Sequence, residues 1–267
     1  MGLVRFQTTS EEYRCGYIIG SSIIDLGKRK PHDALAALPE ALNAERPVHN
    51  RSDVTLLCPV NPGTIVRLDG CYKQDTTDAH DPHIGELATK ETPSLWVAPN
   101  DSLAADCTEV EIPAMVDDVR LGVELGVIIG EQARHLPPTE ALDSVAGYTV
   151  CRTLRAHDGH PGLYGYRMFE GFLGVGSTLV PKITLPVALG VRRNDELADR
   201  SSTACLRFSL GELISYVSHV FTLEPGDLVV TGDPTHITEP IEVGETLTGW
   251  IESVGHQTTV VTTEGEQ

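Results

Sequence analysis

The sequence predicts a β-rich α+β fold, in which a small N-terminal module precedes a larger region built from many short strands. Short β-like runs separated by Gly, Pro, Asn and Asp follow one another along most of the 267 residues. Aromatic residues make up only 5% of the chain, whereas Val, Ile, Leu and Thr are plentiful. Many short strands at such spacing favour a rolled or sandwich-like β architecture.

The N-terminal module is expected to span residues 1–55. Residues 4–6, 14–19 and 22–26 are predicted strands, and Gly20-Ser21 between the last two is a hairpin signal. Residues 33–43 carry apolar side chains at helical spacing and are flanked by Pro31 and Pro47. A module of this size holds too small a core to stand alone, so we expect it to pack on the rest of the chain.

The larger region is expected to span residues 56–267. Its clearest helix is residues 211–220, which place Leu213, Val217 and Val220 on one side. The predicted strands are residues 65–68, 95–98, 122–129, 146–154, 177–180, 206–208, 228–232, 245–251 and 257–262.

Composition excludes several classes of function. A formal net charge of −18 argues against nucleic acid and anionic membranes as partners, because both select basic surfaces. No apolar run approaches the roughly 20 residues that span a bilayer, and the first nine residues lack the plan of a signal peptide. The six cysteines show no C-x-x-C spacing. We therefore expect a cytoplasmic protein without a disulfide framework or a zinc site.

Two segments in the middle of the chain carry the most informative pattern. Residues 122–130 read G-V-E-L-G-V-I-I-G, and residues 147–158 read G-Y-T-V-C-R-T-L-R-A-H-D. They resemble the metal-binding core of the fumarylacetoacetate hydrolase superfamily, E-x-E-L-x-x-V-I-G followed by G-Y-x-x-x-x-D-x-x-A-R-D. Residues 208–234 resemble the family signature E-L-I-x-Y-x-S and T-L-x-P-G-D-x-I-x-T-G-T-P, and residues 169–172 resemble its F-D-G-F segment. The resemblance covers essentially the whole chain.

The resemblance implies a mixed β-sandwich roll with a small N-terminal domain, usually found as a homodimer. It also implies an enzyme that hydrolyses, decarboxylates, hydrates or isomerises 2-oxo or 1,3-dicarbonyl acids. In that family Mg²⁺ or Mn²⁺ binds the oxygens of the 2-oxo acid and stabilises an enolate, which is the Lewis-acid role of a hard cation held by carboxylates.

This chain departs from the family at the metal ligands. The resemblance places the two metal-binding Glu at Gly122 and Glu124 and the metal-binding Asp at Thr153, so one of three ligands is retained. Glu124 alone anchors an ion only weakly, because Mg²⁺ needs near-octahedral oxygen coordination. We therefore expect no family-type metal site, with weak Mg²⁺ or Mn²⁺ binding or a shifted site using Glu170 or Asp75 as the alternatives.

Other functional positions are also altered. The H-x-x-E acid/base pair of relatives is D-x-x-D here, so Asp75 and Asp78 become the candidate proton carriers, and His157 beside the site is a third candidate because histidine titrates near neutral pH. The lysine before the F-D-G-F segment is replaced by Arg167, and the second Thr of T-G-T-P by Asp233.

These substitutions suggest that a fixed cation replaces the metal. If residues 147–157 are extended, Thr153, Arg155 and His157 point to one face by the period of two. A guanidinium there can hold a carboxylate by two contacts. We expect Arg155, with Arg152 or Arg167, to bind an acidic ligand. The competing interpretation is that these arginines pair with Asp75, Asp78 or Asp233 and hold an inactive site together. The remaining residues expected to line the pocket are Tyr72, Thr231, Gly232, Asp233 and Pro234.

The sequence thus predicts a metal-independent enzyme acting on a small carboxylate-bearing oxo or enol substrate by C–C cleavage, decarboxylation, isomerisation or cyclisation. Two alternatives stay open at this point. One is a non-catalytic relative that binds a small acid or supports a partner subunit, and the other is a metal-dependent hydrolase or lyase with a rebuilt site.

Overall fold

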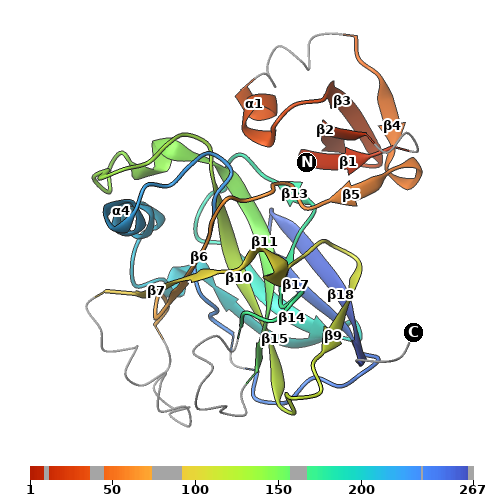
Figure 1. Ribbon diagram of the computed structural model, residues 1–267, viewed down its shortest axis with the longest axis vertical. Coiled ribbons are helices and arrows are strands. Elements are labelled where there is room, and N and C mark those ends of the chain that lie inside the picture. The colour runs from red at the N-terminus through yellow and green to blue at the C-terminus, as the bar shows by residue number, and fades with distance from the viewer. Residues whose placement is uncertain (9–11, 37–44, 74–91, 157–166, 236, 264–267) are drawn as a thin grey trace.

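The computed structural model describes residues 1–8, 12–36, 45–73, 92–156, 167–235 and 237–263. Within these ranges the chain is β-rich and forms three curled sheets, with one long helix at the side of the larger region (Figure 1). The β-rich class predicted from the sequence is therefore confirmed.

The first sheet is made by the N-terminal residues and one strand from the larger region. Its order is β13-β1-β2-β3-β4, and β5 also pairs with β1. Because Leu3 of β1 pairs with Leu179 of β13, the module is joined to the rest of the chain by a strand ladder. The predicted helix begins as α1 (Pro31–Ala36), and its later residues, 37–43, lie outside the described residues. The strands are β1 (Gly2–Gln7), β2 (Tyr13–Ile19), β3 (Ser22–Gly27), β4 (Val48–Asn50), β5 (Thr55–Leu57) and β13 (Thr178–Leu179).

The second sheet is the centre of the molecule, with order β7-β6-β16-β10-β11-β12-β8. The long antiparallel pair β10 and β11 runs through its middle. Alternate residues of β10, including Val123 and Leu125, are buried in the large core, and Gly122 and Glu124 face the other side. The strands are β6 (Ile65–Asp69), β7 (Ser94–Ala98), β8 (Leu103–Ala104), β10 (Val119–Ile129), β11 (Val145–Ala156), β12 (Leu173–Val175) and β16 (Leu228–Val230).

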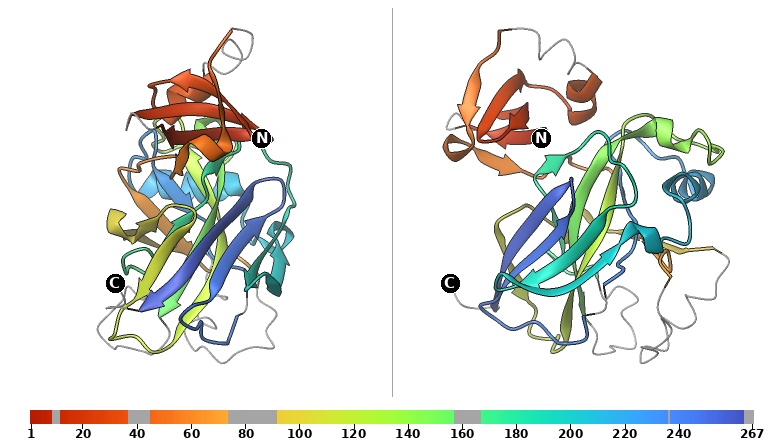
Figure 2. Two further views of the ribbon diagram at one scale, coloured as in Figure 1. Left: turned by 90° about the vertical axis from the view of Figure 1, so that its right-hand side faces the viewer. Right: turned by 180° about the vertical axis from the view of Figure 1, so that it is seen from behind.

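The third sheet packs against the second through the large core, which takes Leu189, Leu247 and Val261 from it (Figure 2). Gly249 lies where β17 crosses β10 and β11, since a Cβ there would meet Val123 Cγ2 at 3.1 Å and Arg152 Cβ at 3.3 Å. The sheet has the order β15-β14-β17-β18-β9. Its strands are β9 (Thr108–Ile112), β14 (Ala188–Arg193), β15 (Glu196–Ser202), β17 (Thr246–Ile251) and β18 (Gly255–Thr263).

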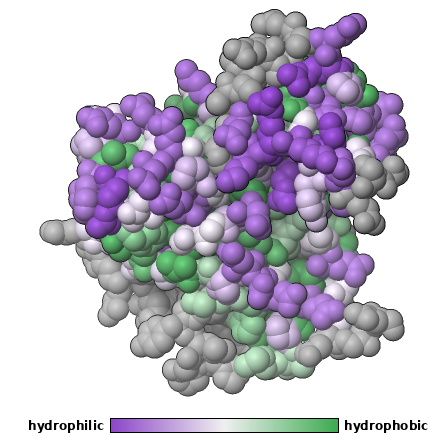
Figure 3. Space-filling model, turned by 45° about the horizontal axis from the view of Figure 1, so that its top comes forward, coloured by the Kyte–Doolittle hydropathy of each residue, from purple (hydrophilic) through white to green (hydrophobic). Residues whose placement is uncertain are grey.

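Helix α4 (Leu210–Val220) confirms the predicted helix and extends it by one residue. It begins at a capping box, in which the Ser209 side chain accepts from the Glu212 backbone N–H and the Glu212 carboxylate accepts from the Ser209 backbone N–H. In the described part of the chain no helix is long and apolar enough to cross a membrane. The face around α4 and the N-terminal module is mainly hydrophilic (Figure 3).

One predicted strand was wrong, and one hairpin was not predicted. Residues 206–208 do not form a strand, and Leu206 makes only an isolated bridge to Tyr72. The hairpin of β14 and β15 was missed because its outer residues are polar and charged. Its signal is the pair Asn194 and Asp195, which take φ values of 50° and 67° between paired strands, as a two-residue type I′ turn requires.

Candidate active site

The residues aligned with the family's metal ligands lie together on one face of the central sheet. Gly122 and Glu124 belong to β10, and Gly122 is directly opposite Thr153 of β11. Strand β16 lies next to β10. The chain that follows β16 passes Glu124, and the Gly232 backbone N–H donates to Glu124 Oε2 at 2.9 Å. The site is thus built from the middle of the sheet, where neighbouring strands fix the backbone.

Arg67 of β6 occupies the centre of this arrangement. Its Nη2 donates to both Glu124 Oε1 and Thr153 Oγ1, the latter at 2.5 Å. The side chains of Arg67 and Glu124 are both 0% exposed. The guanidinium also lies 5.1 Å from the ring centroid of Trp96, where a cation–π contact is favourable. A fixed positive charge therefore bridges two of the three positions that the resemblance assigns to metal ligands.

Arg167 brings a second guanidinium to the same carboxylate. Its Nη1 donates to Asp69 Oδ1 at 2.7 Å and lies 3.7 Å from Glu124 Oε1. Its backbone oxygen accepts from Arg67 Nη1 at 3.5 Å. This location of the Arg167 guanidinium is consistent with the prediction that Arg167 belongs to the site.

Arg155 pairs with Asp233 beside Gly122. Arg155 Nη2 is 3.3 Å from Asp233 Oδ2, and the two side chains are 14% and 0% exposed. Arg155 lies two residues after Thr153 in β11, so the expected alternation places it on the cluster's face of the sheet. Of the three guanidinium groups it is the most exposed to solvent.

These side chains form what we call the central cluster: Arg67, Asp69, Glu124, Thr153, Arg155, Arg167 and Asp233. It contains three guanidinium groups and three carboxylates, so their formal charges balance. Burying such charges is costly unless they are paired and hydrogen-bonded, and removing one partner leaves an uncompensated buried charge. This cost is largest for Arg67 and Glu124, whose side chains are fully buried.

The Mg²⁺ or Mn²⁺ ion implied by the resemblance does not fit this geometry. Position 122 has no side chain, position 153 offers a hydroxyl, and a guanidinium already lies between Thr153 and Glu124. Nowhere in the described ranges do three His, Cys, Asp or Glu side chains form a group that could hold a metal ion. Glu170, considered as a substitute ligand, is exposed.

Tyr72 adds a neutral hydroxyl next to the cluster. Its hydroxyl oxygen lies 3.4 Å from Thr231 Oγ1, and both residues are buried. Burial, reinforced by the negative charges of Glu124 and Asp233, raises the pKa of Tyr72 well above its usual value, whereas the hydrogen bond with Thr231 acts in the opposite direction. Tyr72 is therefore a hydrogen-bond donor at neutral pH. Pro234 is also buried.

The structure separates Arg152 from the cluster. Residue 152 points to the opposite face of β11 from Thr153, and its guanidinium donates to Gln257 Oε1 and to the carbonyl oxygens of Gly171 and Phe172. Burial and the nearby charge of Arg67 lower the pKa of Arg152. We therefore assign it a packing role and do not retain it as a ligand-binding residue.

The three proposed proton carriers, Asp75, Asp78 and His157, lie outside the described residues. Conversely, sequence reasoning missed Arg67 and Asp69. The available signal was a charged residue within the apolar run of residues 65–68, which an ordinary buried strand would not contain. The mapping of family positions did not include it.

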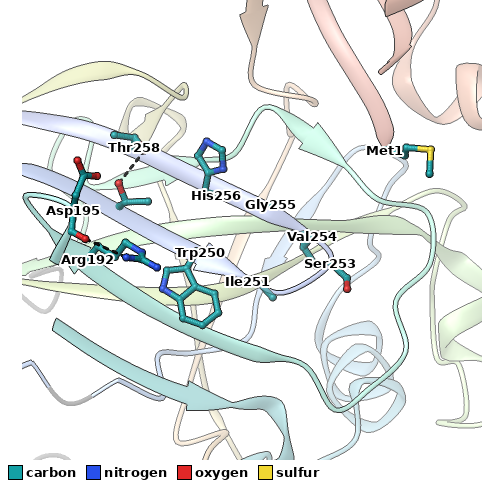
Figure 4. Close-up of a pocket in the computed structure, with 11 residues that line it drawn as sticks. Met1, Arg192, Asp195, Trp250, Ile251, Ser253, Val254, Gly255, His256 and Thr258 are labelled. Atoms are coloured by element: carbon teal, nitrogen blue, oxygen red, sulfur yellow. Dashed lines mark hydrogen bonds between the residues drawn. The ribbon is translucent and has the colours of Figure 1, made fainter. Parts of the chain in front are cut away.

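A separate pocket of about 700 Å³ lies on the third sheet and shares no lining residue with the central cluster (Figure 4). Trp250, His256 and Arg192 line it, together with Thr248 and Thr258, whose hydroxyls are 3.0 Å apart.

The fold and the placement of the cluster define a protein of the fumarylacetoacetate hydrolase fold. The family model "Fumarylacetoacetate (FAA) hydrolase C-terminal" matches residues 64–262, and the chain belongs to this family. Among solved structures, 5-carboxymethyl-2-hydroxymuconate delta-isomerase from Mycobacterium smegmatis matches with a TM-score of 0.82 at 23% identity, over 99% of this chain and 100% of that one.

The curated relatives include enzymes. The chain is 31% identical over 265 residues to oxaloacetate tautomerase Fahd2a, mitochondrial, of Rattus norvegicus, covering 88% of this chain and 81% of that protein. It is 31% identical over 242 residues to the homoprotocatechuate catabolism bifunctional isomerase/decarboxylase of Escherichia coli, covering 85% of this chain and 54% of that protein. The chain thus spans about half the length of the second relative. The family to which it belongs includes isomerases, decarboxylases and tautomerases.

Proposed function

We propose that this protein is a metal-independent enzyme of the fumarylacetoacetate hydrolase family that acts on a small 2-oxo, 1,3-dicarbonyl or enol acid. The observation that carries the proposal is the guanidinium of Arg67 between Glu124 and Thr153. A positive charge fixed there supplies the electrostatic environment in which a developing enolate is stabilised, without a divalent ion.

The relatives support the reaction class. A tautomerase and an isomerase/decarboxylase are among them. A tautomerase moves a proton next to a carbonyl group, and a decarboxylase of an oxo acid releases a carboxylate there as CO₂. In the proposed isomerisation a base removes the proton from the carbon next to the carbonyl. The C–H electrons form the C=C bond, and the carbonyl π electrons move to oxygen, which takes up a proton.

The described side chains supply complementary groups for such a substrate. Arg155 and Arg167 are the proposed contacts for the substrate carboxylate, because a guanidinium matches a carboxylate by two parallel hydrogen bonds. Tyr72, which is neutral, is the proposed donor to the oxygen that becomes the enol. Asp75 and Asp78, with His157, stay the proposed proton carriers.

Turnover of oxaloacetate between its keto and enol forms, followed by ultraviolet absorbance, tests the proposal. Purified enzyme in excess EDTA is expected to retain its rate, and Arg155→Ala is expected to lose at least about 100-fold, as for removal of a charged contact in a water-excluded site. Arg193→Ala is the matched control, because Arg193 of β14 also pairs with a carboxylate, Glu245, and the third sheet contributes no residue to the central cluster. A rate that EDTA abolishes and Mn²⁺ restores would contradict metal independence, and full activity of Arg155→Ala would contradict the site.

The second candidate is a non-catalytic relative that binds a small acid. The observation favouring it is the equal number of guanidinium groups and carboxylates in the central cluster, which compensate one another without a ligand. It predicts no turnover of any oxo acid with retained acid binding. The homodimer expected from the resemblance is a further proposal, and sedimentation equilibrium at micromolar concentration tests it.

A further inference from the structure

Asp233 places its carboxylate in the space that a side chain at position 122 would fill. A Cβ built on Gly122 would lie 1.9 Å from Asp233 Oδ2 and 2.5 Å from its Cγ. Contacts of that length do not occur between non-bonded atoms, so this position of Asp233 requires glycine at 122. The carboxylate missing at position 122 is therefore matched by a carboxylate that arrives from residue 233.

The two oxygens of Asp233 have different surroundings. Oδ1 accepts from the backbone N–H of Thr235 at 2.9 Å, from the Thr235 hydroxyl at 2.6 Å and from the backbone N–H of Val123 at 3.3 Å. Oδ2 is buried and accepts no hydrogen bond within the described residues, and its charged neighbour is Arg155 Nη2 at 3.3 Å. Anchoring through Oδ1 thus holds Oδ2 against a guanidinium.

The Arg155 guanidinium has N–H donors that its contact with Asp233 does not fully use. Its distance to Asp233 is longer than the 2.7–2.9 Å typical of a charge-assisted N–H···O contact. Its Nε is buried and donates no hydrogen bond to any described residue. Since the Arg155 side chain is the most exposed of the three guanidinium groups in the cluster, it is the one that a ligand from solvent would reach first.

We infer that Asp233 is an internal counter-ion that competes with an acidic ligand for Arg155. The inference rests on the proposed function, in which Arg155 binds the carboxylate of the substrate. A ligand carboxylate at Arg155 must displace Asp233 or share the guanidinium with it. Because Asp233 lowers the fraction of Arg155 that is free to bind, it weakens the apparent affinity for the acid. Asp233 is thus a residue that sets affinity, and the acid binds without a metal ion.

Calorimetric titration of the metal-stripped full chain with oxalate tests this role. Asp233→Thr restores the residue of the family signature, and Asp233→Asn, a second variant, retains an acceptor for Val123 and Thr235. Each is expected to bind oxalate about tenfold more tightly than the unmodified protein, as is typical of a charge-assisted contact released from competition. Arg155→Gln is expected to abolish binding in all backgrounds. Circular dichroism verifies that every variant is folded.

Glu245→Gln is the matched control. It removes the same charge from a carboxylate that pairs with Arg193 of β14, in a sheet that contributes no residue to the central cluster, and should change the affinity less than about twofold. If both folded Asp233 variants bind oxalate no more tightly than the unmodified protein while Arg155→Gln abolishes binding, the counter-ion role is overturned and the proposed carboxylate contact stands. If Arg155→Gln binds oxalate as the unmodified protein does, or if no variant binds it, both ideas are overturned.

Discussion

Replacing Arg67 by methionine is predicted to destabilise the protein strongly. Methionine retains an unbranched side chain but removes the guanidinium. Glu124, which is fully buried, then has as its remaining described partners the Gly232 backbone N–H at 2.9 Å and Arg167 at 3.7 Å. Breaking a buried ion pair by removing one partner costs about 3–5 kcal/mol. Losing the contact with the Trp96 ring adds about 2 kcal/mol, because the guanidinium is desolvated. The total is a large fraction of the 5–15 kcal/mol that typically separates folded and unfolded states.

Urea unfolding followed by far-ultraviolet circular dichroism measures this effect. The double variant Arg67→Met with Glu124→Met should recover most of the loss, because replacing both charges by apolar groups is often close to neutral. Lys28→Met is the control for an exposed pair, since Lys28 and Glu12 are 60% and 45% exposed and such pairs contribute at most about 1 kcal/mol. A loss below about 1 kcal/mol for Arg67→Met would refute the view that this guanidinium is the essential cation of the cluster.

Three further outcomes follow from described contacts. Gly122→Ala should lower the free energy of unfolding in urea by about 1–3 kcal/mol, because the added methyl group meets the Asp233 carboxylate. Adding Asp233→Ala should recover part of that free energy, and additive losses in the double variant would contradict the steric coupling. Burial alone would raise the pKa of Asp25, but hydrogen bonds from Arg14, Gly27 and His49 outweigh this effect and lower the pKa. The ionised Asp25 therefore stabilises the fold at pH values above its ordinary pKa of about 3.9. This stabilisation is lost as the pH falls through the lowered pKa. Asp25→Asn should thus show a shallower fall in melting temperature below about pH 5, and an unchanged slope would contradict this assignment. Ser209→Ala should cost about 1 kcal/mol through the lost helix cap, and a cost near zero would show that the capping box does not contribute.

Local periodicity explains which parts of the fold were predictable. The alternation of β11 placed Thr153 and Arg155 on one face, because the direction of successive side chains in a strand depends only on the strand itself. Helix α4 was predictable because its apolar spacing and its capping residues lie within the helix or next to it. By contrast, residues 206–208 had strand-like composition, but their backbone forms only an isolated bridge, between Leu206 and Tyr72.

The central cluster depends on contacts that local patterns do not contain. Arg67 meets Glu124 across 57 positions of sequence, from a strand separated from β10 by β16. Asp233 was recognisable as a substitution, but its insertion beside Gly122 follows from the path of the chain after β16. The resemblance to the family was therefore enough to locate the site, whereas the arginine at its centre could be identified only from the folded structure.

Calorimetric titration of the metal-stripped protein with Mn²⁺ tests whether a guanidinium occupies the place of the metal. We expect no stoichiometric binding, because Arg67 donates to both Glu124 and Thr153 and repels a second cation. Binding of one Mn²⁺ per chain with micromolar or tighter affinity, lost on Glu124→Gln, would contradict it.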